Sequence, residues 1–593
     1  MKPAQKVNFQ RMLRPRHIAF IGGKDAIIAI GEARRRGYTG AYWPVNPRRK
    51  TLAGIPCFGS TRDLPEAPDA VFLAIPAQQA IETIKELADM GAGGIVCYAA
   101  GFKEAGEDGA HLETALVEAI GDMAMIGPNC YGIINYLDDM ALWPFAHGGY
   151  CPGYGAAIIT QSGMFSSDIS MSQRSIPLTF MVSAGNQAAM GLEDFIDIFS
   201  VHKDTRTIGV HIEGLADIQK FEAAALKALK NDTPVVVLKT GTSDIGSRLT
   251  MSHTGSLSGS NAFYDALFQR CGVISVDSPS QFLETLKYLC VVDRPKGNHI
   301  AGFTCSGGGA TMLADHGEQI ALEFPAFDKA ATKKLRALLP PIATVSNPLD
   351  YTTPIWGQPE ITEQIFQAAI AAQNADATVL VQDYPAPGLD ESKMFYMNDA
   401  GAFGNAARKL GVPAAICATL PENLDQETRE MLIAKGIAPM QGIHECLNAM
   451  KHACDWSKAR QDILNALLPP VLPARGTAST PRYLNEYEGK VILTKAGMLV
   501  PKGKLVRGKD VVNRAEDIGY PVVLKMMNDK LLHKTEAGAV KVAINNSTEL
   551  TVAVEDMKTS VSAYDPAAIS DLFLLKKMGT PPLAELVIGL QRD

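Results

Sequence analysis

Short apolar runs alternate with amphipathic stretches along the first part of the chain. The apolar runs lie at residues 18–21, 41–46, 70–75 and 94–98. Runs of this length predict strands, and the apolar positions at about 26–36, after the glycine turn Gly22-Gly23, predict a helix between the first two. Strands that alternate with helices indicate a parallel, doubly wound α/β sheet, with ligands at the carboxyl ends of the strands.

The same alternation starts again at two later points of the chain. Strands are predicted at residues 156–160 and 208–214, and a further set begins at 300–305. A proline-rich stretch without periodicity at 467–477 marks a linker. The sequence therefore predicts domains at residues 1–140, 150–295, 296–465 and 481–593, with a linker at 466–480.

The size and charge of the chain limit the classes of function that fit it. A chain of 593 residues is too long for one hydrophobic core and corresponds to about four domains. Its net charge of -7 disfavours nucleic acid as the main partner. The amino terminus lacks the apolar segment of a signal peptide, and no apolar run reaches the length of a membrane span, so we expect a cytoplasmic protein without a membrane partner. Ten cysteines without a C-x-x-C pair indicate neither a zinc site nor a disulfide framework.

One loop carries the residues most suited to group transfer. His253 stands in a run of glycines and hydroxyl residues at 251–260, just ahead of an amphipathic stretch at 261–268. Backbone N–H groups of such a loop can bind a phosphate, and neutral imidazole is a competent nucleophile near pH 7. A lone loop histidine is more often only solvated, so the residues by themselves leave both a phosphoryl carrier and a surface histidine open.

The run at residues 252–259, Ser-His-Thr-Gly-Ser-Leu-Ser-Gly, resembles the phosphohistidine loop of the ADP-forming acyl-CoA synthetases, relatives of succinyl-CoA synthetase. The resemblance extends from about residue 10 to the last residue. It implies a Rossmann-like CoA-binding domain, two flavodoxin-like domains of the succinyl-CoA synthetase type and the first part of an ATP-grasp domain. It also implies that His253 is phosphorylated, with Thr254 and Gly255 among the phosphate-binding residues.

Loops that follow the predicted strands of the first domain are similar to the CoA-binding loops of that family. The resemblance assigns CoA binding to Gly22, Lys24, Val45, Asn46, Ile75, Pro76, Ala100, Gly101, Phe102 and Asn129. After Gly22 the family usually has a small residue and a serine, whereas this chain has Gly23-Lys24, so the contacts to the CoA diphosphate are expected to differ. The basic residues at 48–50 could meet CoA phosphates or simply be solvated.

Three further features resemble parts of the phosphohistidine site. Ser162-Gly163 opens a predicted helix with Ser162 as a suitable N-cap, and a helix amino end carries partial positive charge. A glycine run opens another helix, in which the resemblance makes Gly308 and Gly309 phosphate-binding residues. Glu213 ends a predicted strand. By itself it would be a surface residue, but the resemblance makes it the carboxylate that orients the active histidine.

Beyond the linker the chain resembles the start of an ATP-grasp domain. The resemblance implies ATP-binding roles for Lys525, Lys577, Met578 and Glu585. His533 matches a second histidine that some family members use to relay phosphate. The family's domain continues past the last residue of this sequence, so ligands for Mg²⁺ are expected beyond residue 593, either in a longer chain or in a partner.

Together these features predict an acid–thiol ligase that makes acyl-CoA and ADP from a carboxylic acid, CoA and ATP, through phosphohistidine and acyl-phosphate intermediates. A ligase for a small dicarboxylate, as in succinyl-CoA synthetase, and a CoA-sensing region of a protein acetyltransferase stay open. Apolar residues after Gln187, with Trp143, Phe145 and Phe165, favour an aromatic or branched acid unless these side chains belong to the core. A homo-oligomer is expected.

Overall fold

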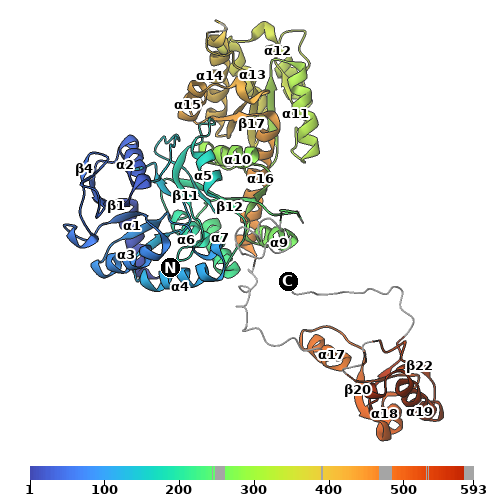
Figure 1. Cartoon of the computed structure of the whole chain (residues 1–593). Coiled ribbons are helices and arrows are strands. Elements are labelled where there is room, and N and C mark those ends of the chain that lie inside the picture. The colour runs from blue at the N-terminus through green and yellow to red at the C-terminus, as the bar shows by residue number, and fades with distance from the viewer. Residues whose placement is uncertain are drawn as a thin grey trace. The chain divides into compact units, whose positions relative to one another are not determined.

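The computed structural model describes residues 1–243, 245–246, 261–388, 391–466, 484–528, 531 and 533–579. The chain divides into two compact units, Met1–Pro473 and Ala474–Asp593 (Figure 1). The first unit contains three large sheets made mainly of parallel strands, and the second contains a four-stranded antiparallel sheet. The predicted α/β class is confirmed. Among the described residues, no helix is long and apolar enough to cross a membrane.

The first sheet is fully parallel and has the strand order β2-β1-β5-β6-β7. Its strands are β1 (His17–Gly22), β2 (Ala41–Val45), β5 (Ala70–Ala74), β6 (Gly94–Cys97) and β7 (Ala124–Ile126). The helices packed around it are α1 (Pro3–Leu13), α2 (Lys24–Arg36), α3 (Ala77–Met90) and α4 (Glu107–Ala119). Helix α2 buries Ala26, Ile30 and Ala33 because they recur at helical spacing, and it ends at Gly37, whose φ of 106° favours glycine.

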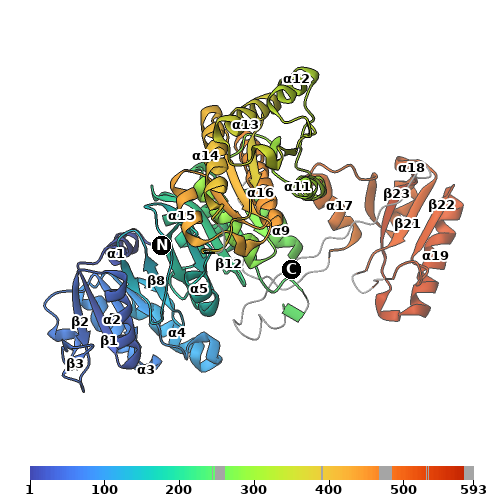
Figure 2. The ribbon, with the colours of Figure 1, turned by 90° about the horizontal axis from the view of Figure 1, so that it is seen from above.

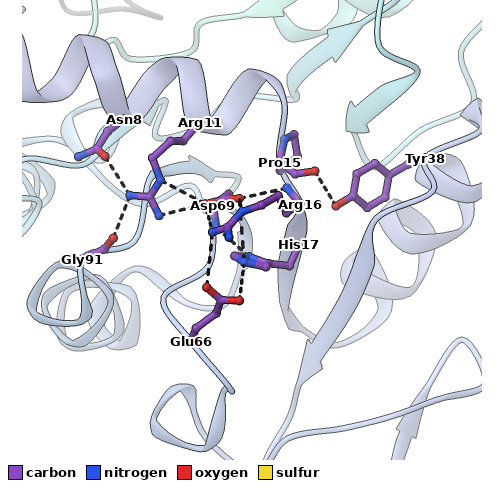
Figure 3. A network of polar contacts seen from close by, with 9 residues as sticks. All are labelled: Asn8, Arg11, Pro15, Arg16, His17, Tyr38, Glu66, Asp69 and Gly91. Atoms are coloured by element: carbon purple, nitrogen blue, oxygen red, sulfur yellow. Dashed lines mark hydrogen bonds and ion pairs between the residues drawn. The ribbon is translucent and has the colours of Figure 1, made fainter.

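A buried carboxylate fastens the amino-terminal edge of this sheet (Figure 3). Asp69, directly before β5, accepts hydrogen bonds from Nε and Nη2 of Arg11 at 3.1 and 3.0 Å and from Nε of Arg16 at 2.8 Å. The N–H of Asp69 donates to Nδ1 of His17 at 3.1 Å. Burial alone would raise the pKa of the Asp69 carboxyl, but the donors on Arg16 and Arg11 outweigh it and hold the pKa at about 2. The network joins α1 to β1 and β5 at the edge opposite to the predicted ligand edge.

The second sheet has the order β14-β13-β12-β10-β11-β8-β9. Its parallel strands are β10 (Gly155–Thr160), β11 (Leu178–Ser183), β12 (Thr205–Ile212), β13 (Val235–Lys239) and β14 (Ile274–Val276). Its helices are α5 (Gly163–Ser170), α6 (Leu192–Phe199), α7 (Ile218–Lys230), α9 (Asn261–Cys271) and α10 (Pro279–Val291).

An antiparallel hairpin closes one edge of the second sheet. It consists of β8 (Gly132–Asn135) and β9 (Met140–Leu142), and β8 pairs with β11. Residues 132–140, which were predicted to belong to the first domain, therefore belong to the second sheet in the structure. The physical reason is that backbone pairing with β11, and not chain order, decides which sheet a strand joins.

The third sheet is parallel, with the order β16-β15-β17-β18-β19. Its strands are β15 (Ile300–Thr304), β16 (Leu349–Asp350), β17 (Ala377–Val381), β18 (Ala414–Ala418) and β19 (Ala438–Gln441). The helices that accompany it, labelled in Figure 2, are α11 (Gly307–Gln319), α12 (Lys329–Leu338), α13 (Pro359–Gln373), α14 (Lys393–Leu410), α15 (Gln426–Ala434) and α16 (Ile443–Asn465).

A buried ion pair on α10 connects the second and third sheets. Nζ of Lys287 lies 3.0 Å from Oε1 of Glu284, and both side chains are fully buried. The other oxygen, Oε2 of Glu284, accepts the N–H of Gln441, the last residue of β19, at 2.9 Å. Burial lowers the pKa of Lys287 to about 8 although the Glu284 carboxylate opposes this change. Glu284 thus contacts Lys287 through one oxygen and the end of β19 through the other, and it connects helix α10 of the second sheet to the third sheet.

The second unit contains an antiparallel sheet of order β20-β23-β21-β22. Its strands are β20 (Gly503–Arg507), β21 (Val522–Met526), β22 (Val540–Ile544) and β23 (Leu572–Lys577), and its helices are α17 (Glu486–Lys495), α18 (Val511–Ile518) and α19 (Ser547–Tyr564). Helices α18 and α19 share one buried cluster with the strands, in which Val511 and Leu550 pack with Leu524 and Phe573. The unit therefore has a hydrophobic core of its own.

Candidate active site

The carboxyl edge of the first sheet gathers the residues predicted to bind CoA. Gly22 ends β1 with a φ of 147°, and a Cβ there would lie 2.5 Å from the carbonyl oxygen of Ala74, so glycine is required. Asn46 donates from Nδ2 to the carbonyl oxygen of Gly22 at 2.8 Å and accepts the N–H of Arg48 at 2.9 Å. The other predicted residues follow strand ends of the same sheet or flank them: Lys24, Val45, Ile75, Pro76, Ala100, Gly101, Phe102 and Asn129.

Glu104 shapes the loop after β6 and is a residue that the sequence did not single out. Its Oε1 accepts the N–H groups of Gly101 at 2.7 Å and of Phe102 at 3.2 Å. Burial would raise the pKa of Glu104, but the hydrogen bond from Asn186 and these backbone donors lower it. Phe102 is buried as a whole residue, and its N–H is already bonded to Glu104, so this predicted residue lies beneath the CoA edge.

The carboxyl edges of the first and second sheets are joined by hydrogen bonds. Asn186, in the loop after β11, donates from Nδ2 to Oε2 of Glu104, and its N–H donates to the carbonyl oxygen of Pro128 at 2.9 Å. The N–H of Tyr131 donates to Oγ of Ser183, the last residue of β11, at 3.0 Å. The two carboxyl edges therefore lie side by side.

Two helices begin where phosphate binding is predicted. Helix α5 starts at Gly163, and Oγ of Ser162 accepts the N–H of Phe165 at 3.4 Å. Helix α11 starts at Gly307, and its N-cap residue makes no capping bond through its side chain. First-turn N–H groups of both helices carry partial positive charge that suits an anion.

The glycines at the start of α11 differ in whether a side chain would fit at their positions. A Cβ on Gly309 would lie 2.7 Å from Oγ1 of Thr304, so close packing excludes a side chain there. A Cβ on Gly308 would meet only Oγ of Ser306, at 3.7 Å. Gly307 is similarly open, since a Cβ there would meet only Oδ2 of Asp350 at 3.6 Å, so packing requires glycine at neither position. The remaining predicted phosphate-site residues, His253, Thr254 and Gly255, lie outside the described residues.

Glu213 follows β12 directly and is held by Gln161, which follows β10. Oε1 of Gln161 accepts the N–H of Glu213 and, at 3.1 Å, that of Gly214. Nε2 of Gln161 donates to the carbonyl oxygen of Gly214 at 2.8 Å. Because β10 and β12 are neighbours, these residues meet at one edge of the sheet. Gln161 was not predicted as a site residue, because its only signal in the sequence is that it is a polar residue at the end of a buried apolar strand.

Lys239 brings positive charge to the same edge and was also missed. It ends β13 and pairs with Ile212, the residue before Glu213. Its Nζ lies 4.8 Å from the ring centroid of Tyr264, and the residue is 9% exposed. Burial lowers the pKa of Lys239, and the charge of Glu213 opposes this change. A carboxylate, an ammonium group and a helix amino end at one sheet edge suit an imidazole that carries a phosphoryl group.

In the second unit, Lys525 belongs to a cluster of charges around Glu486. Nζ of Lys525 lies 2.9 Å from Oε2 of Glu486, and the ammonium groups of Lys490 and Lys576 lie 2.6 and 3.4 Å from its Oε1. Burial would raise the pKa of Glu486, but Lys490 and Lys525 hold it at about 2. Burial and the neighbouring Lys490 lower the pKa of Lys576 to about 8. Three basic side chains around one carboxylate suit the phosphates of a nucleotide.

The other residues predicted to bind ATP have different surroundings. Lys577 donates to two backbone carbonyl oxygens at 2.9 and 2.8 Å, and the N–H of Met578 donates to the carbonyl oxygen of Pro521 at 3.0 Å. The side chain of His533 is 68% exposed and lies on the surface of its unit. Glu585 lies outside the described residues.

Two cysteines lie beside the CoA edge among the described residues, and the same residues bear on metal binding. In the part of the chain that the structure describes, no three His, Cys, Asp or Glu side chains could hold a metal ion together. The thiols of Cys97 and Cys130, beside the CoA edge, are buried, and burial raises the pKa of Cys97 to about 12 and that of Cys130 well above its ordinary value. Neither is a thiolate near pH 7.

Models of three domain families match the chain. Residues 16–136 match a CoA binding domain, residues 154–289 match a succinyl-CoA ligase like flavodoxin domain, and residues 475–593 match an ATP-grasp domain. These matches cover the first sheet, most of the second sheet and the second unit.

Curated proteins align with almost the whole chain. A trans-feruloyl-CoA synthase of an unknown prokaryotic organism is 30% identical over 599 residues, which cover 98% of this chain and 83% of that protein. An ADP-forming acetate–CoA ligase of Archaeoglobus fulgidus is 28% identical and an ADP-forming 4-hydroxybutyrate–CoA ligase of Nitrosopumilus maritimus is 27% identical; each alignment covers 98% of this chain and 84% of the relative.

A solved structure has the same fold over most of the chain. It is the dinucleotide-forming acetyl-coenzyme A synthetase 1 of Ca. Korarchaeum cryptofilum in complex with phosphate and ADP, with a TM-score of 0.68 and 23% sequence identity. The match covers 77% of this chain and 99% of that one. The arrangement of the parallel sheets described above is therefore one that a solved protein adopts.

Proposed function

The chain belongs to the ADP-forming acyl-CoA synthetase family of acid–thiol ligases, and we propose that it joins an aromatic carboxylic acid to CoA while ATP is cleaved to ADP and phosphate. One observation carries this function to particular residues. The edge of the first sheet, where CoA is expected, is hydrogen-bonded to the edge of the second sheet, where Glu213, Gln161 and Lys239 meet. A CoA thiol and a phosphorylated side chain can therefore reach the same acyl group.

We propose that the phosphoryl group travels on His253. An imidazole nitrogen attacks the γ-phosphorus of ATP, a P–N bond forms and ADP leaves. A carboxylate oxygen of the acid then attacks this phosphorus, which gives an acyl phosphate and returns the imidazole. Finally the CoA sulfur attacks the acyl carbon, loses its proton and displaces inorganic phosphate. His533, exposed on the second unit, is proposed to carry the phosphoryl group before His253.

The described residues each have a task in these steps. Glu213 is proposed to accept the imidazole N–H of His253, which fixes the tautomer and stabilises the phosphorylated ring. Gln161 holds the backbone of Glu213 in place through its three hydrogen bonds. Lys239 and the first turn of α5 are proposed to stabilise negative charge on the phosphoryl group. The CoA thiol is proposed as the sulfur nucleophile, and the thiols of Cys97 and Cys130 are buried.

The nucleotide is proposed to bind in the second unit at the lysine cluster around Glu486. Mg²⁺ is proposed to accompany ATP there. Among the described residues, no three His, Cys, Asp or Glu side chains could hold it together. The protein is also proposed to be a homo-oligomer and to act in the cytoplasm. Sedimentation of the purified protein tests its oligomeric state.

Running the second half of the reaction in reverse tests the carrier without ATP. Feruloyl-CoA or acetyl-CoA with radiolabelled inorganic phosphate should form an acyl phosphate and then label His253. We expect a label on the protein that is stable in base and labile in acid, and that is lost in His253→Asn. His299→Asn, at a half-exposed histidine of the third domain, is the matched control and should keep the label. A label that persists in His253→Asn would overturn the carrier assignment.

A further inference from the structure

Four aromatic side chains form a cluster where the first and second sheets adjoin. The ring centroid of Tyr131 lies 4.4 Å from that of Phe145 and 5.7 Å from that of Trp143. The ring centroids of Tyr98 and Phe145 are 6.5 Å apart. Trp143 is fully buried, whereas Tyr98, Tyr131 and Phe145 are only half-buried. Trp143 therefore belongs to the core, and the other three rings keep part of their surface open to solvent.

The cluster sits on the first turn of α5. A Cβ on Gly163 would lie 3.0 Å from the ring of Tyr131, so this ring covers the backbone at the start of the helix. The hydroxyl of Tyr131 lies 3.2 Å from Sδ of Met164, which is 63% exposed. Half-open rings and an exposed thioether thus border the helix end at which a phosphoryl group is proposed to bind.

The backbone fixes the rings between the two ligand edges. Tyr131 is tied to the end of β11 through Ser183, and Tyr98 comes directly after β6 of the first sheet. An acyl group that is phosphorylated near α5 and then attacked by a CoA thiol from the first sheet must pass through this junction. A planar apolar acyl group could lie against these rings, because aromatic rings favour offset-stacked or edge-to-face contacts with one another.

We propose that Tyr131, Phe145 and Met164 form the wall of the acyl-group site and that they select an aromatic acid. This inference rests on the proposed ligase function and adds to it the residues that determine the substrate class. The flat faces of Tyr131 and Phe145 contact the ring of the acid, and Met164 adapts to its outer edge. Acetate lacks a ring, so the wall distinguishes the two acids.

Substrate ratios test the wall. For wild type, Tyr131→Leu and Tyr131→Phe, kcat/KM is measured with 4-hydroxycinnamate and with acetate, together with KM for CoA. We expect Tyr131→Leu to lower the ratio of kcat/KM for 4-hydroxycinnamate over acetate by roughly 10- to 100-fold, because the ring contact is lost. Tyr131→Phe keeps the ring and should stay within about threefold of wild type. The control Tyr154→Leu removes a half-buried ring before β10, at the opposite end of the same sheet, and should leave the ratio unchanged.

Each outcome decides the inference. An unchanged ratio in Tyr131→Leu would refute it and leave the proposed function standing. A wild type that activates acetate, branched or dicarboxylic acids but no aromatic acid would refute both the wall and the aromatic substrate of the proposed function, and would leave only the acid–thiol ligase reaction. A wild type that forms acyl-CoA from no acid would instead overturn the proposed function. If Tyr131→Leu fails to fold, as judged by circular dichroism, Phe145→Leu replaces it and must lower the same ratio by at least about tenfold.

Discussion

Replacing Gln161 by leucine tests whether the loop of Glu213 is positioned by this single side chain. The substitution removes three hydrogen bonds, two to the N–H groups of Glu213 and Gly214 and one to the carbonyl oxygen of Gly214. A hydrogen bond of this kind contributes about 0.5 to 1.5 kcal/mol, so the three predict a loss of roughly 1.5 to 4.5 kcal/mol in the free energy of unfolding. Gly214 is buried, which leaves its polar groups without water.

The same change should slow phosphoryl transfer. A partner that orients an active-site group typically contributes about 10- to 100-fold, and we expect a loss of that size in the single-turnover labelling of His253 from acyl-CoA and phosphate. Urea unfolding measures the stability, and the labelling rate measures the chemistry. Gln173→Leu, at an exposed glutamine beyond the end of α5, is the matched control. Stability and rate both equal to wild type in Gln161→Leu would refute the reasoning.

Three further substitutions probe charges. Lys239→Met should lower the single-turnover labelling rate by about tenfold or more, because the ammonium beside Glu213 is lost; an unchanged rate contradicts this role. Asp69→Asn should lower the free energy of unfolding, measured with urea at pH 7, by about 2 kcal/mol, because the pKa of Asp69 is lower in the folded protein than in the unfolded chain. This stabilisation is complete above about pH 4 and is lost as the pH falls to about 2. An equal stability difference between wild type and Asp69→Asn at pH 7 and at pH 3 would argue against it. Glu486→Gln should tighten ATP binding several-fold in calorimetry at low salt, because Lys525 loses a competing carboxylate; weaker binding would disprove it.

The first sheet was largely predictable because its signals are local. The apolar runs 41–46 and 70–75 became β2 and β5, and the predicted helix ends at Arg36, where Gly37 adopts the left-handed conformation that stops it. The hairpin β8–β9 was not predictable in this way. Its pairing partner β11 lies about fifty residues further along the chain, and nothing within the hairpin itself specifies that partner.

The site was predicted only as far as its loops carry unusual residues. Glycines that permit close approach, such as Gly22, mark themselves in the sequence because other residues are excluded there. Gln161, Lys239 and Glu486 have no such mark. Each acquires its role from a neighbour that sheet pairing or helix packing brings near. Lys239, for example, pairs with Ile212 on the adjacent strand and so comes close to Glu213.

Product analysis tests the central claim most directly. The purified protein, together with the further residues or partner chain expected to supply the Mg²⁺ ligands, is incubated with CoA, ATP, Mg²⁺ and a panel of acids. The panel contains acetate, succinate, branched acids and 4-hydroxycinnamate, and all nucleotide and thioester products are quantified by chromatography. The account predicts that acyl-CoA, ADP and inorganic phosphate form in equal amounts, with the highest kcat/KM for the aromatic acid. Formation of acyl-CoA together with AMP and pyrophosphate, or of no acyl-CoA from any acid, would contradict it.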